Sequence, residues 1–158
     1  MQIIYLKSLE ENSVRKGTHW SSPNIPMSIL EIEELEIKYN SSKPFPIALR
    51  ELLHLAGKDC YFLDKGLNES QEELQKFVRE NLRDDVRKID RPFFAIDVYN
   101  TFDQFLFVYL DEGEDPPVYE AHYSDHPSRE HWISLVIKSL SKFVENNVER
   151  VKQGRNPF

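Results

Sequence analysis

Three strand-like runs joined by short turns place the strongest constraint on how this chain can fold. They span Phe93–Tyr99, Gln104–Leu110 and Pro117–Tyr123, and turn-forming residues fill 100–103 and 111–116. Connections this short join antiparallel neighbours, because parallel strands need a crossover of roughly a dozen residues or more. The sequence therefore predicts an antiparallel meander.

Helical patterns stand on both sides of these strands. Capping boxes of the form S-x-x-E at 28–31 and 70–73 predict the beginnings of two helices, and a proline and a glycine bound another over 46–57. An apolar stripe over 130–151 predicts one long closing helix. Strands grouped together, with helices before and after, predict a single α+β domain that spans all 158 residues.

The helix over 46–57 carries its own expectations. Pro46 suits the first helical position, because its missing N–H would have no partner there. Gly57 can adopt the left-handed backbone conformation that ends a helix. Apolar side chains recur at helical spacing and predict a core-facing stripe. The solvent face is then assigned to Arg50, Glu51 and His54.

Cysteine content and hydropathy indicate in which cellular compartment the protein is expected. The single cysteine, Cys60, excludes an internal disulfide and a four-cysteine zinc module. Cys60–Leu63 is predicted as a short buried strand, with Cys60 a core residue and not a nucleophile. The N-terminal apolar run Ile3–Leu6 is too short for a signal peptide, and no stretch approaches the roughly 20 apolar residues of a spanning helix. We expect a soluble cytoplasmic protein with no membrane partner.

The net charge of the chain and its distribution indicate which kinds of partner to expect. The formal net charge is -7 and the pI is about 5.3, so nucleic acid is not an expected partner, because phosphate binding needs a basic footprint. From Pro92 to Ser128 there is no Lys or Arg, whereas acidic residues are frequent. Such a stretch is either an ordinary solvated surface or a docking surface for a basic protein.

The alternation of the strands adds aromatic residues to that hypothesis. In Phe105–Leu110 the aromatic side chains point to one face of the sheet and the aliphatic ones to the other. The aromatic face is either a partner-binding face or is covered by a helix or the N-terminal segment. The candidate interface residues are Asp97, Asp103, Tyr109, Asp111, Glu112, Glu114, Asp115 and Tyr119.

Catalytic and metal signals are weaker. His122, His126 and His131 lie close to Asp125 and Glu130, so a metal-dependent enzyme stays an alternative, although the spacing fits no HExxH pattern. Ordinary surface histidines are the other interpretation. The glycines are too dispersed for a phosphate loop, and no nucleophile motif occurs. We predict no catalytic residue, no bound metal and no cofactor.

The order of these patterns resembles a known family. Ile29–Glu36 resembles the first helix of the SUKH superfamily, which comprises bacterial toxin-immunity proteins related to a yeast cell-wall synthesis regulator. Phe45–Gly57 is similar to its L-P-x-x-[FY/L]-[KR]-x-[FL]-L-x-x-x-G helix. The strands at 104–110 and 117–123, with the closing helix that contains Ser141-Lys142-Phe143, resemble its C-terminal half. The resemblance covers about 28–146.

This resemblance implies an α+β fold and a non-enzymatic function. A SUKH-like immunity protein binds and neutralises a cognate protein toxin, often a nuclease, which we expect to be basic. The family shares no functional residues that can be transferred to this chain. The alternative is a regulatory or scaffold module that binds a housekeeping partner. Under the immunity hypothesis, reversing the charges of Asp111, Glu112, Glu114 and Asp115 should slow association far more than it changes stability.

Overall fold

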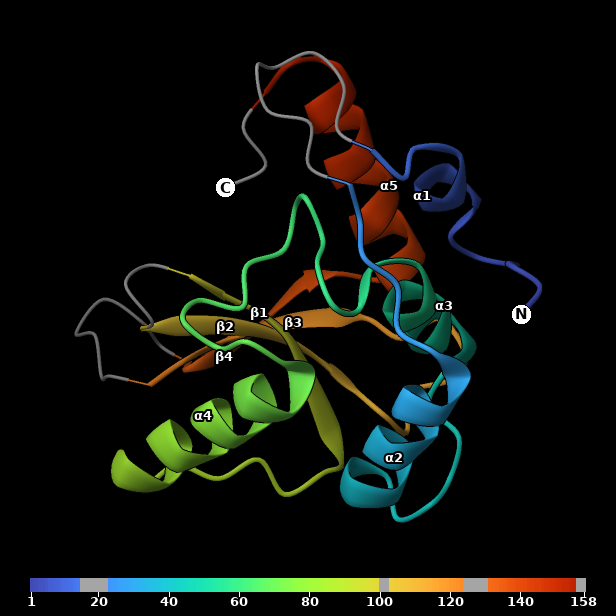
Figure 1. The fold of residues 1–158 in the computed structure, drawn as a ribbon. Helices are drawn as coiled ribbons and strands as arrows, with labels where there is room; N and C mark the ends of the chain where they lie inside the picture. The colour runs from blue at the N-terminus through green and yellow to red at the C-terminus, as the bar shows by residue number, and fades with distance from the viewer. Residues whose placement is uncertain (15–22, 100–102, 124–130, 156–158) are drawn as a thin grey trace.

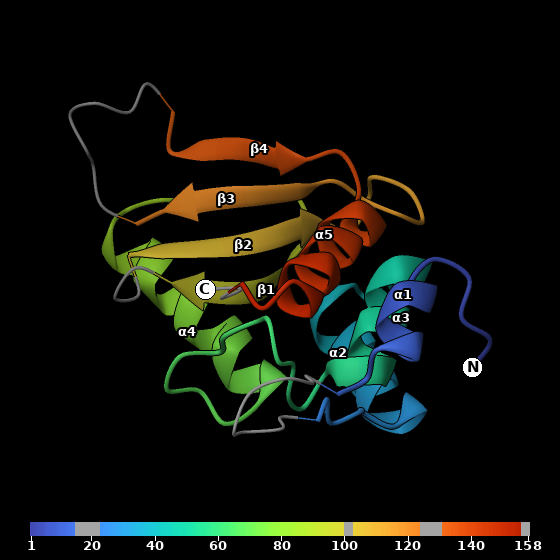
Figure 2. The same ribbon diagram turned by 90° about the horizontal axis from the view of Figure 1, so that it is seen from above.

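The computed structural model describes residues 1–14, 23–99, 103–123 and 131–155. Across that part of the chain, one sheet contains four strands: β1 (Phe93–Tyr99), β2 (Gln104–Tyr109), β3 (Val118–His122) and β4 (Ile133–Ile137). The strands lie in the order β1-β2-β3-β4, and all neighbours are antiparallel (Figure 2). The predicted meander and α+β class are confirmed, with β4 as an additional strand.

The helices surround this sheet. They are α1 (Lys7–Glu11), α2 (Ile29–Tyr39), α3 (Ile47–Ala56), α4 (Gln71–Asp84) and α5 (Leu140–Lys152). Figure 1 shows α4 beneath one face of the sheet, α5 above the other face, and α2 and α3 beside one end. No helix among the described residues is long and apolar enough to cross a membrane.

Side-chain alternation along the strands divides the apolar core into two clusters. Leu106 and Val108 face the cluster that includes α2, α3 and α5. Phe105 and Phe107 face the other cluster, which is closed by the apolar side of α4, and both are fully buried. The aromatic face is therefore covered at Phe105 and Phe107, whereas Tyr109 and Tyr119 on the same face are only partly buried.

The prediction of one helix over 130–151 was wrong in its first part. Ile133–Ile137 forms β4, and α5 begins at Leu140 after Ser139, whose side chain accepts a hydrogen bond from the Lys142 amide. The segment Ile-Ser-Leu-Val-Ile continues the apolar spacing of the helix, and periodicity alone does not separate a short apolar strand from a helix. The N-cap at Ser139 marks the boundary.

Three smaller corrections concern the region around α3. Pro46 is the N-cap residue and precedes the first helical position. Gly57 has φ -71° and ψ -27°, which is right-handed, so it does not end the helix by a left-handed turn. A Cβ at Gly57 would lie 2.5 Å from the Leu53 carbonyl oxygen and 2.6 Å from Met27 Sδ, so close approach requires the glycine. Cys60–Leu63 is buried at Cys60 and forms a turn, not a strand.

The two outer edges of the sheet differ. On β1, the Gln75 side chain pairs with both main-chain groups of Ala95, at 2.7 and 2.9 Å, and Val98 donates to the Asp64 carbonyl oxygen at 2.9 Å. These contacts satisfy the free edge of β1. No described segment pairs with the outer edge of β4, where Leu135 is 52% exposed and Val136 is 46% exposed.

Glu51 was placed on the solvent face of α3 by the sequence, and this was wrong. Its exposed fraction is 0%, and its carboxylate accepts hydrogen bonds from the amides of Ile4, Tyr5 and Leu6 at 2.5, 2.9 and 2.8 Å. Arg50 and His54 are half buried. The carboxylate attaches the N-terminal segment to α3, because charged acceptors bind main-chain amides strongly.

Replacing Glu51 tests this attachment. In Glu51→Gln the charge is lost and one of the two acceptor oxygens becomes a donor, so buried amides lose their partner. We expect the free energy of unfolding, measured with urea, to fall by about 2 kcal/mol. Glu10→Gln, at an exposed position on α1, is the control and should unfold like the parent. An unchanged midpoint for Glu51→Gln would contradict the assignment.

Candidate functional site

The connection between β2 and β3 carries four of the predicted interface residues. Glu114 sits against the beginning of α3: its Oε2 accepts from the Ile47 amide at 2.9 Å, and its carbonyl oxygen accepts from the Ala48 amide at 2.9 Å. The N-cap residue Pro46 offers no side-chain cap of its own. Glu114 therefore supplies, from a distant part of the chain, the acceptors that the first turn of α3 needs.

Asp115 performs the same role for α5. Its carboxylate accepts from the Ser141 amide at 2.8 Å and from the Ser141 hydroxyl at 2.5 Å, and the adjacent Pro116 carbonyl accepts from the Leu140 amide at 2.7 Å. A carboxylate beside a helix N-terminus also interacts favourably with the helix dipole. Both Glu114 and Asp115 thus bind main-chain amides at the N-terminus of a helix, and Glu114 is also exposed to solvent.

Asp111 and Glu112 are organised by one arginine. Arg91 contacts Asp111 at 2.5 Å and Glu112 at 2.8 Å, and its guanidinium lies 3.9 Å from the centre of the Tyr109 ring. The hydrogen bond from Arg91 lowers the pKa of Asp111 and keeps this carboxylate ionised. The side chain of Asp111 is 45% exposed and that of Glu112 is 22% exposed. The acids are fixed in position yet reachable from solvent.

Two tyrosines complete this group. The rings of Tyr109 and Tyr119 meet edge to face with centroids 5.0 Å apart, and the Tyr119 hydroxyl donates to Glu112 at 3.0 Å. Both rings are half buried, and desolvation raises the pKa of each hydroxyl. Phe107 stacks on Tyr119 with centroids 5.6 Å apart, which joins the group to the core. We call this set the tyrosine–acid patch: Arg91, Tyr109, Asp111, Glu112 and Tyr119.

The patch continues on two sides. Leu135 is the register partner of Tyr119 and is largely exposed, so it extends the apolar area across β4. On the other side, Asp111 and Glu114 help to line a surface hollow of about 390 Å³ at the beginning of α3. An exposed apolar area bordered by charged groups is the usual composition of a protein-binding surface.

The remaining predicted acids lie elsewhere. Asp103 is half exposed at the beginning of β2, at the opposite end of that strand from Tyr109. Asp97 is only 8% exposed, and its Oδ1 accepts from the Asp64 amide at 2.7 Å. Burial raises the pKa of Asp97 to about 8. Asp97 therefore belongs to the interior and attaches the loop before α4 to β1.

The raised pKa of Asp97 predicts a pH dependence of stability. The folded chain holds the Asp97 proton up to about pH 8, whereas the unfolded chain releases it near pH 4, so this group lowers the free energy of unfolding as pH rises between those values. In Asp97→Asn the side chain stays neutral and its oxygen still accepts from Asp64. We expect the stability of this variant relative to the parent to increase across that window in urea titrations.

The exposed acid Asp84 provides the control for this titration. Asp84→Asn should unfold like the parent, because a substitution at an exposed surface position changes stability little. A constant difference between Asp97→Asn and the parent across the window would show that Asp97 is ionised in the folded protein and would contradict the prediction.

The histidine cluster is not assembled in the described part of the chain. His122 is 1% exposed, and its Nε2 lies 2.8 Å from Glu120 Oε1 and 3.0 Å from Gln104 Nε2. His131 is exposed, and His126, Asp125 and Glu130 lie outside the described residues. No group of three or more His, Cys, Asp or Glu side chains is placed to hold a metal among the residues described.

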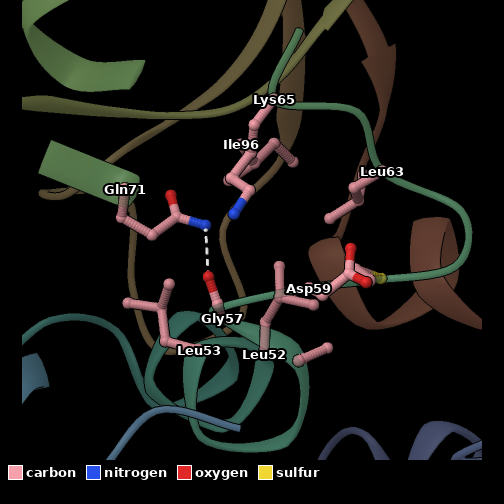
Figure 3. Close-up of a pocket in the computed structure, with 10 residues that line it drawn as sticks. Leu52, Leu53, Gly57, Asp59, Leu63, Lys65, Gln71 and Ile96 are labelled. Atoms are coloured by element: carbon pink, nitrogen blue, oxygen red, sulfur yellow. Dashed lines mark hydrogen bonds between the residues drawn. The ribbon is translucent and has the colours of Figure 1, made fainter. Parts of the chain in front are cut away.

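The region around Cys60 provides no reactive thiolate either. Burial raises the pKa of the Cys60 thiol to about 12, so the thiolate needed for nucleophilic attack does not form near neutral pH. Leu52, Leu53 and Ile96 help to line a cavity of about 20 Å³, in which Gln71 donates to the Gly57 carbonyl at 2.9 Å (Figure 3). That volume accommodates about one water molecule and no substrate.

Sequence reasoning missed Arg91, although a signal existed. β1 and β2 pair with Phe93 opposite Tyr109 and Phe94 opposite Val108. Continuing this antiparallel register outward places Arg91 opposite Asp111. A search of the basic residues that flank the Lys- and Arg-free span, combined with the predicted meander, would have identified the residue that organises the patch.

No family model, curated protein or solved structure matches this chain. The resemblance to the SUKH superfamily accordingly stays a prediction.

Proposed function

We propose that this protein is a non-enzymatic binding protein of the toxin-immunity kind, which neutralises a basic protein toxin by covering it with the tyrosine–acid patch. One observation carries the proposal: a half-buried pair of tyrosines shares its surface with two carboxylates that Arg91 holds in place. The resemblance to SUKH immunity proteins and the net charge of -7 support the same function.

The patch has the physical properties of an interface centre. Tyr109 and Tyr119 are backed by the core, so they offer contact area with little loss of conformational entropy on binding. The charge of the patch is incompletely balanced, because one guanidinium faces two carboxylates. A basic side chain of a partner would complete that balance, and the overall negative charge would accelerate its approach.

The interface proposed here is smaller than the acidic span of the sequence. The proposal assigns the docking charge to Asp111 and Glu112, because Asp97, Glu114 and Asp115 each accept hydrogen bonds from main-chain amides of another segment. Reversing the charge of Asp115 should therefore reduce stability, whereas reversing that of Asp111 should act on binding. The two kinds of acid can be separated by experiment.

Co-expression with basic nuclease toxin domains encoded beside the gene tests the function. The parent protein should restore growth, and the purified pair should associate faster at low salt. Tyr119→Ala and Asp111→Lys should each weaken binding on the order of tenfold or more, because they remove an aromatic anchor and reverse a central charge. Association kinetics and urea unfolding of the same variants separate loss of binding from loss of stability.

Glu10→Lys is the matched control, since Glu10 is an exposed acid on α1, beside α5 and away from α4 (Figure 1). It should bind the toxin domain like the parent. If Asp111→Lys and Tyr119→Ala bind as tightly and as fast as the parent at low salt, the patch is not the interface. If the parent protects against none of the adjacent toxins, the immunity function is overturned.

A further inference from the structure

A second surface feature has the opposite charge to the rest of the protein. At the C-terminal end of α4 a groove of about 490 Å³ is lined, among the described residues, by four cationic residues and by apolar residues that include Leu82 and Phe93. The cationic residues are Arg79, Arg83, Arg87 and Lys88. In a chain with a net charge of -7, such a concentration of positive charge is a local feature that bulk composition does not explain.

Arg79 gives the groove a fixed cation. Its guanidinium donates to the Gln75 side chain at 2.9 Å and to the Phe93 carbonyl at 2.9 Å, and it lies between the rings of Tyr39 and Phe93, at 4.7 and 4.3 Å from their centres. Among the described residues no carboxylate pairs with Arg79, and desolvation lowers the pKa of its guanidinium. A desolvated cation without a counter-charge is stabilised when an anion approaches.

Movable cations border this fixed one. Arg83 is exposed and lies one helical turn after Arg79, about 6 Å further along the axis of α4. Lys88 pairs with Asp90 at 2.6 Å, but both side chains are about 80% exposed, so this ion pair contributes little and can exchange partners. The groove thus offers several positive groups spaced along its length, which a single small anion would not engage together.

Val86, at the end of α4, is an exposed apolar residue whose backbone conformation is strained. α4 ends in a Schellman motif, in which the Val86 amide donates to Arg83 and the Arg87 amide donates to Leu82, at 3.1 and 2.7 Å. Val86 occupies the left-handed position of this motif with φ 55°, where a β-branched residue is strained. Its side chain is 94% exposed, so packing does not explain its presence. Strain at an exposed position points to function.

We propose that this groove binds an acidic segment of a partner protein, with carboxylates on Arg79, Arg83 and Lys88 and an aliphatic or aromatic side chain against Leu82, Val86 and Phe93. Clusters of arginine beside apolar residues recognise acidic peptide motifs in this way. The groove shares no residue with the tyrosine–acid patch, so this proposal does not rest on the function proposed above. It gives the protein two binding surfaces of opposite charge.

Binding of a labelled peptide tests the groove directly. The probe is a short fluorescein-labelled peptide in which Glu and Leu alternate, and the matched probe alternates Lys and Leu. We expect fluorescence anisotropy to show saturable binding of the Glu–Leu peptide alone, weakened at higher salt. Arg83→Glu and Lys88→Glu should each reduce its affinity on the order of tenfold. Lys142→Glu, at an exposed lysine on α5, should leave the affinity unchanged.

Val86→Gly provides a test that loss of folding cannot imitate. Glycine adopts the left-handed conformation without strain, so the variant should unfold at a higher urea concentration than the parent while it binds the Glu–Leu peptide more weakly. Failure to bind the Glu–Leu peptide, equal binding of the Lys–Leu peptide, or equal losses in Lys142→Glu would each overturn the proposal. Displacement of the peptide by millimolar inorganic phosphate alone would assign the groove to small anions and would overturn it as well.

Discussion

Two adjacent carboxylates in the turn between β2 and β3 determine how the sheet is joined to two of its helices. Glu114 accepts a hydrogen bond from the first turn of α3, and Asp115 accepts one from the first turn of α5. A single turn therefore binds the N-termini of both helices. The first amides of a helix have no partner inside the helix, and a carboxylate supplies a hydrogen-bond acceptor and a favourable charge together. The orientation of α3 and α5 relative to the sheet depends on this turn, and so does the placement of the core cluster that includes α2, α3 and α5.

The same interaction recurs at other places in the molecule. The carboxylate of Glu51 accepts hydrogen bonds from amides of the N-terminal segment, and that of Asp97 accepts one from the loop before α4. Glu36 likewise accepts from the Phe45 amide at 2.8 Å. Glu51 and Asp97 lie far in sequence from the amides that they bind, whereas Glu36 is nine residues from Phe45. The acidic excess of the chain is thus partly structural, and net charge alone overstates the area available for a basic partner. The acids that remain on the tyrosine–acid patch are Asp111 and Glu112.

The elements that were predicted correctly are those with local signals. The meander follows from alternation and short turns, and the capping box that begins α2 is present as expected. β4 was missed because Ile133–Ile137 has the same apolar spacing as the helix after it, and only pairing with β3 decides its conformation. Of the predicted interface residues, Tyr109, Asp111, Glu112 and Tyr119 come together, whereas Asp97, Glu114 and Asp115 bind main-chain amides.

The sequence by itself determined the class of fold, the pairing of β1, β2 and β3 and the two faces of these strands, because side-chain period and turn length are local properties. It did not determine which charged side chains reach solvent. Glu51 lies in the apolar helix α3, and nothing in its neighbours along the chain shows that main-chain amides of the N-terminal segment bind its carboxylate. Tertiary structure decided this, because a carboxylate is buried only where packing brings unpaired donors to it.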